Sequence, residues 1–162
     1  LMMPTLRLEI DQRILAAAMK RMDPARVFTI ARAAMNETLA YLEGEVVKSI
    51  PLTPGNTGVT RGAVFSAMHG TSLPGLWGEV GNPLAHTVVL ELGRRPGGRM
   101  PPIAPIELWA RRKLGKSGLG WVIARNIARR GLPAHHMFAN AASRGTNVVQ
   151  RIWLRHFSGW GR

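Results

Sequence analysis

The chain has 162 residues and no cysteine, and its 22 Lys and Arg against 9 Asp and Glu give a net charge of +13. This length suits one domain with a core of its own, and the lack of cysteine excludes a disulfide framework and thiolate metal sites. A net charge this positive predicts an anionic partner. No apolar run approaches the roughly 20 residues that a membrane span needs. We expect a single domain over 1–162, with parts at 1–50, 51–102 and 103–162.

Two helices are predicted in the first part. Apolar residues at helical spacing over 10–18 predict a short one. Asp23 followed by Pro24 is typical of a helix start, because aspartate caps free N–H groups and proline fits the first helical position. The apolar stripe that follows predicts a long helix over 24–49, ended by Pro51. The side chains expected to be buried in it are Ile30, Ala34 and Tyr41.

Three short strands are predicted in the middle part, over 63–68, 76–80 and 85–92. Each is an apolar run bounded by glycine, proline or asparagine, and short runs joined by tight turns favour a small antiparallel sheet. The segments 51–58 and 93–102 are rich in proline and glycine, so we expect loops without regular pairing there.

Helices return in the last part. One is predicted to begin at Pro105 and to end at Gly115, and another spans 121–130 and is closed by a glycine. A final apolar stripe covers 138–157, and Gly145 is expected to interrupt it. The predicted fold class is therefore α+β: a long N-terminal helix, a small antiparallel sheet in the middle and C-terminal helices.

Three of the five tryptophans, Trp109, Trp121 and Trp153, fall on the apolar stripes of these helices. We expect them in the core or at a subunit interface. Stacking on nucleic-acid bases is the alternative, because aromatic side chains among cations can bind single strands in that way.

The positive charge is confined to the end of the chain. Residues 1–93 carry eight cations and eight acids, whereas residues 94–162 carry 14 cations and one acid, Glu107. Several of these cations are spaced four residues apart on predicted helices, where like charges repel. We therefore expect compensation from outside the monomer, by DNA phosphates or by acidic protein surfaces. A solvated basic face is the alternative.

No catalytic or metal site is predicted. The histidines near the C-terminus have no Asp, Glu or Cys beside them in sequence to complete a metal site. Ser66, His69 and Ser72 lie close together but have no orienting acid, and 93–98 lacks the pattern of a nucleotide-binding loop. We expect no enzyme activity, no bound metal and no cofactor.

Three motifs follow one another along the chain. The first is TGVTR at 57–61, after a proline-rich loop. The second is LAHTVVLELG at 84–93, followed by MPP at 100–102, and the third is PAHHMFANAA at 133–142. In this order and spacing they resemble the neck and tail-completion proteins of long-tailed bacteriophages, of the minor tail protein Z type. The resemblance covers about 52–142.

This resemblance implies a structural virion protein rather than an enzyme. Such a protein would form a homo-oligomeric ring of six or twelve copies at the phage head–tail junction, assembled in the host cytoplasm. Its neighbours would be the head-completion protein on the portal side and the tail terminator protein, and genomic DNA would pass through its channel. The alternative, from charge alone, is a sequence-independent DNA-binding protein that uses the basic C-terminal half.

We expect the basic half to face neighbouring subunits or rings, because a fully basic channel would slow the exit of the genome. Glu91, at the end of the third predicted strand, is expected to pair with the arginines of the loop after it or to dock a neighbouring subunit; an exposed carboxylate of little consequence is the alternative. The residues assigned to these inter-subunit or inter-ring contacts are Glu91, Arg94, Arg95, Arg99, Arg111, Arg112, Arg125, Arg129, Arg151 and Arg155.

Overall fold

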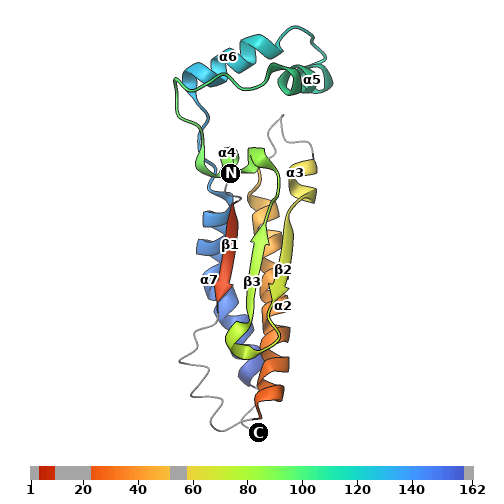
Figure 1. The fold of residues 1–162 in the computed structure, drawn as a ribbon, viewed down its shortest axis with the longest axis vertical. Coiled ribbons are helices and arrows are strands. Elements are labelled where there is room, and N and C mark those ends of the chain that lie inside the picture. The colour runs from red at the N-terminus through yellow and green to blue at the C-terminus, as the bar shows by residue number, and fades with distance from the viewer. Residues whose placement is uncertain (1–3, 10–22, 52–57, 159–162) are drawn as a thin grey trace.

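The computed structural model describes residues 4–9, 23–51 and 58–158. It has an α+β fold in which one three-stranded antiparallel sheet packs against two long helices (Figure 1). The predicted class is confirmed, with a long helix near the N-terminus, the sheet in the middle and helices at the end. The short helix expected over 10–18 lies outside the described residues, as does most of the loop expected over 51–58.

The long helix α2 spans Pro24–Ser49, as predicted. The Asp23 carboxylate accepts the backbone N–H of Ala25 at 3.2 Å, and Pro24 occupies the first helical position. The local sequence therefore contains both features that start the helix, which is why its beginning could be predicted.

Burial along α2 follows the predicted stripe only in part. Ala34 is fully buried, whereas Ile30 and Tyr41 are half-buried at the margins. The centre of the buried face passes through the larger side chains Met35 and Leu42, which belong to the main hydrophobic core. This core lies between α2, α7 and the inner face of the sheet.

The sheet has the strand order β1-β3-β2, and both pairings are antiparallel. β2 spans Phe65–His69 and β3 spans Trp77–Gly81, close to two of the predicted strands. The third strand is β1, Thr5–Glu9, which the sequence pattern did not predict. It pairs with the opposite side of β3 from β2 and so places β3 in the centre.

The strand predicted over 85–92 is wrong: this segment is the helix α4, Ala85–Leu92. The buried Asn82 turns the chain at its start, because its side-chain oxygen accepts the Leu84 N–H and the Thr87 hydroxyl, each at 3.0 Å. The apolar residues at 88–90 and 92 are almost consecutive, so this short run shows no period that separates helix from strand. Glu91 consequently lies in the last turn of a helix rather than at the end of a strand.

The last helix, α7, spans Met137–Ser158 and continues through Gly145, contrary to the predicted interruption. Gly145 is buried against α2, and a Cβ atom there would lie 2.8 Å from Leu42 Cδ2. The glycine therefore lets two helices approach closely rather than breaking one. Further along the same contact, the Trp153 indole donates a hydrogen bond of 3.1 Å to the Thr38 hydroxyl.

Two short elements are α3 (Val59–Gly62) and the 3-10 helix η1 (Leu73–Gly75). Together with the sheet, α2, α4 and α7 they form the part of the molecule that we call the body, which comprises all described residues outside 94–132. The helices α5 (Ile103–Leu114) and α6 (Gly120–Arg130) lie beyond the end of the sheet, apart from α2 and α7 (Figure 1). We call residues 94–132 the hairpin. No described helix is both long and apolar enough to cross a membrane.

Candidate functional site

The hairpin leaves the body after α4 and returns to it before α7. At its base, Arg94 and Leu132 exchange two backbone hydrogen bonds of 2.8 and 2.9 Å, and one turn further out the Gly97 N–H donates to the Ala128 carbonyl at 2.8 Å. The segment 93–102 is otherwise irregular, as predicted, apart from this single bridge. These backbone hydrogen bonds therefore join the outgoing and returning segments of the chain at the base of the hairpin.

Glu91 secures the point where the chain re-enters the body. Its side chain is buried, with 8% of the residue exposed, and its carboxylate accepts the N–H groups of Phe138 at 3.0 Å and Ala139 at 3.2 Å. These are free donors in the first turn of α7, where a negative charge also matches the helix dipole. The ion pair expected between Glu91 and the arginines of the following loop is therefore wrong.

Glu107, the one acid among residues 94–162, likewise accepts backbone hydrogen bonds at the start of a helix, in this case within the hairpin. Its two carboxylate oxygens accept the N–H groups of Gly118 at 2.6 Å and Gly120 at 2.7 Å, at the start of α6. Arg111 lies 3.4 Å away. Gly120 is needed here, because a Cβ atom would come within 2.8 Å of the Glu107 side chain. The acid thus joins α5 to α6.

These contacts are expected to make the stability of the hairpin depend on pH. The Gly118 and Gly120 N–H groups, with a smaller effect of Arg111, hold the pKa of Glu107 below its ordinary value. A carboxyl whose pKa is lower in the folded than in the unfolded chain stabilises the fold above its unfolded pKa, and this stabilisation is lost as the pH falls through the folded pKa.

We expect the α6 amides to exchange faster with solvent at about pH 3 than at neutral pH, after correction for the intrinsic pH effect. Glu107→Gln should show the faster exchange already at neutral pH and little further change on acidification. Glu9→Gln, on the distant strand β1, is the control. Equal protection of α6 in parent and Glu107→Gln proteins at neutral pH would contradict this role.

The hairpin carries most of the positive charge. Its 39 residues contain ten cations and one acid, a net charge of +9. Arg111 pairs with Glu107, and the Arg125 guanidinium lies 5.1 Å from the ring centre of Trp121. The other hairpin cations form no ion pair with any residue that the structure describes; they are Arg94, Arg95, Arg99, Arg112, Lys113, Lys116, Arg129 and Arg130.

The two remaining predicted contact residues lie elsewhere, on α7. Arg155 forms an ion pair with Glu37 of α2, and the same carboxylate lies 2.8 Å from His156. Arg155, and then His156, hold the pKa of Glu37 below its ordinary value. The Arg151 side chain contacts the backbone carbonyl of Asn147 at 3.4 Å. Arg155 is therefore compensated within the chain, so the basic half is two separate regions rather than one.

Exposed apolar side chains gather on the hairpin as well. Only three of its residues are buried, Ala110, Gly120 and Ala124. Among the described residues ten large hydrophobic side chains are exposed, and seven of them belong to the hairpin: Met100, Ile103, Leu108, Leu114, Trp121, Val122 and Leu132. Trp121, predicted to lie in a core or an interface, is 49% exposed, so it is not part of a core in the monomer.

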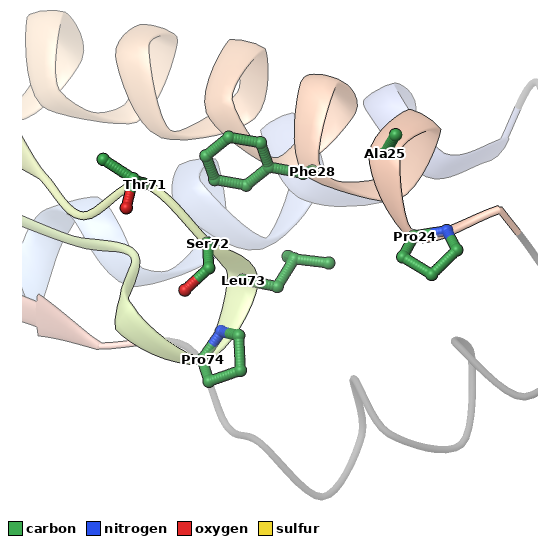
Figure 2. A pocket seen from close by; sticks show the side chains of 7 residues that line it. All are labelled: Pro24, Ala25, Phe28, Thr71, Ser72, Leu73 and Pro74. Atoms are coloured by element: carbon green, nitrogen blue, oxygen red, sulfur yellow. The ribbon is translucent and has the colours of Figure 1, made fainter.

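The body has a pocket that contains no charged side chain. This shallow pocket of about 260 Å³ lies between the start of α2 and η1, and Figure 2 shows Phe28 and Leu73 among its lining side chains. The Ser66 hydroxyl donates to Glu43 at 2.6 Å, and His69 pairs with Glu79 rather than with a serine. No group of three potential metal ligands occurs in the described parts of the chain.

The three sequence motifs meet around α4. Thr60 Oγ1, from the first motif, lies 2.9 Å from His86 Nε2 at the start of the helix. At its other end the Glu91 carboxylate holds the third motif through Phe138. Segments far apart in sequence thus converge on the helix from which the hairpin departs. No protein-family model, curated protein or solved structure matches the chain.

Proposed function

We propose that this chain is a structural protein of a phage virion, which forms a ring at the head–tail junction. In this role the ring joins the head-completion protein to the tail terminator, and genomic DNA passes through its channel. The order of the three motifs supports the phage assignment, and their meeting around α4 gives the resemblance one spatial centre. The proposal involves no catalysis.

The observation that carries the assembly role is the hairpin. It projects from the body, has a net charge of +9 and exposes seven large apolar side chains. This surface does not stabilise a monomer, because exposed apolar side chains and like charges without partners both raise the free energy of the isolated chain. An element of this kind suits a protein that is stable in contact with neighbours.

Native mass spectrometry of the purified chain tests the proposal, and electron microscopy shows the particle shape. We expect closed rings of six or twelve copies. Charge reversal at Arg94 and Arg95 should prevent tailed particles from assembling while the circular dichroism of the purified variant stays unchanged. Normal particles with the reversed charges would remove these residues from the proposed contacts.

A second function is supported by the cations that lack ion pairs within the described chain. They would suit a monomer that binds DNA without sequence preference. Such a protein would bind any duplex, and its affinity would fall with a log–log salt slope that grows by about 0.9 for each phosphate contacted. The oligomeric mass separates the two functions, because a closed ring supports the first and a monomer that binds DNA supports the second. Within an assembled ring, the directions of six side chains decide whether the basic groups contact DNA or protein: Arg111, Arg112, Arg125, Arg129, Arg151 and Arg155. Side chains that point mostly into the channel would favour direct contact with DNA.

A further inference from the structure

The outer face of α6 combines apolar and cationic side chains in one row. Trp121, Arg125 and Arg129 follow one another at intervals of four residues and therefore lie on one side of the helix. Trp121 and its neighbour Val122 are 49% and 55% exposed. The Arg125 guanidinium stacks on the Trp121 ring at 5.1 Å, so the cation and the aromatic ring form one surface.

This surface fits a protein better than a nucleic acid. Interfaces between proteins have an apolar centre enriched in Trp, Met and Arg, with polar groups around it. Nucleic-acid interfaces are more polar, and Val122 or the exposed Leu108 has nothing to offer a phosphate. The hairpin has a net charge of +9. A partner that binds it must therefore present an acidic surface, because a neutral or basic surface would not offset the repulsion among the hairpin cations.

A second copy of this chain does not supply that acidic surface. Residues 1–93 are electrically neutral overall, and residues 133–162 carry four cations and no acid. Two acids of the body, the exposed Glu9 and the half-buried Glu37, already form ion pairs with Arg7 and Arg155. Within the described residues, no surface outside the hairpin therefore carries enough unpaired acids to balance a charge of +9.

We infer that the outer face of α6 docks on a different protein, at an acidic surface with an apolar centre, with Trp121 as the anchor. In the proposed ring this would be the contact to an adjacent ring rather than between identical subunits. This inference relies on the proposed function in one respect, namely that the hairpin joins the protein to its neighbours. Its physical basis, charge and exposed apolar area on one helix face, is independent of the ring.

Three labelled probes test it by fluorescence anisotropy. The first is a helical peptide of leucine and glutamate with leucines at positions i, i+3, i+4 and i+7, and the second is the same composition in scrambled order. The third is a DNA duplex of about 30 base pairs, with all measurements at about 0.15 M salt. We expect the amphipathic peptide to bind about tenfold more tightly than the scrambled one, and more tightly than the duplex.

The matched variants are Trp121→Ser on the hairpin and Leu154→Ser on α7, because both parent side chains are exposed. Trp121→Ser should weaken amphipathic-peptide binding about tenfold and leave duplex binding within about twofold, whereas Leu154→Ser should change neither. Val122→Ser repeats the test if Trp121→Ser is poorly folded. Absence of peptide binding, tighter binding of the duplex, or equal losses for both probes overturns the inference.

The particle mass, measured on the same samples, keeps the two proposals apart. Peptide binding that depends on Trp121 in a protein that never forms rings would support the docking face and count against the ring. Rings whose subunits bind the amphipathic and scrambled peptides equally would leave the ring in place and refute the docking face.

Discussion

Replacing Glu91 with alanine is expected to lower the free energy of unfolding by about 3 kcal/mol. The carboxylate is buried and accepts two N–H groups of the first turn of α7, from Phe138 and Ala139. Alanine would leave the buried Phe138 N–H without an acceptor and would remove a negative charge from the positive end of a long helix. Both effects act where α7 meets α4, at the base of the hairpin.

Urea denaturation followed by circular dichroism gives the measurement. Glu91→Gln keeps one acceptor oxygen and should cost about half as much as alanine. Glu9→Ala is the matched control: its carboxylate pairs with Arg7, but the side chain is 66% exposed, so a change within about 0.5 kcal/mol is expected. If Glu91→Ala and Glu9→Ala unfold at the same urea concentration, the contact with α7 does not stabilise the fold.

The sequence predicted those elements whose ends are marked by nearby residues. α2 begins at Asp23 and Pro24, and α5 ends at Gly115 in the left-handed conformation, with φ of 64°. In each case the residue that starts or stops the helix is a chain neighbour of the helix itself. Such signals act through local backbone geometry, so no knowledge of the tertiary structure is needed to use them.

Several features that the sequence pattern did not predict depend on distant partners. α4 is set by Asn82, whose amide also donates to the Thr60 carbonyl 22 residues earlier in the chain. The first turn of α7 is held by Glu91, 47 residues before Phe138. The strand β1 is paired only because β3 lies beside it. The contacts of Asn82 with Thr60, of Glu91 with Phe138 and of β1 with β3 leave no period in the local sequence. The apolar pattern of 85–92 could therefore not distinguish α4 from a strand.

The candidate site was predicted in charge but not in shape. The excess of cations after residue 93 is visible in the sequence, but the arrangement of these groups in space is not. Their division between the hairpin and α7 depends on where the chain turns back, and the pairing of Arg155 with Glu37 spans 118 residues. Helical spacing placed Trp121 on an apolar stripe, but only the structure shows that about half of this residue stays exposed.

Replacing Ala34 with aspartate is expected to destabilise the protein by about 4 kcal/mol. Ala34 is fully buried in the middle of α2, one turn before Thr38, which accepts the indole N–H of Trp153 from α7. Arg155 of α7 lies one turn further along α2, but it is already paired there with Glu37, so a carboxylate at position 34 would be buried without compensation. It would protonate or force α2 and α7 apart, and either outcome costs stability.

Ala33→Asp separates burial from helix propensity, because Ala33 is the preceding residue of the same helix and is exposed. It carries the same intrinsic cost of aspartate in a helix, about 0.5 kcal/mol, without the burial. Thermal and urea unfolding of the two variants, with the parent alongside, measure the difference. Similar midpoints for Ala33→Asp and Ala34→Asp would mean that α2 presents a different face to α7. The contact between Trp153 and Thr38, and the core built around it, would then be wrong.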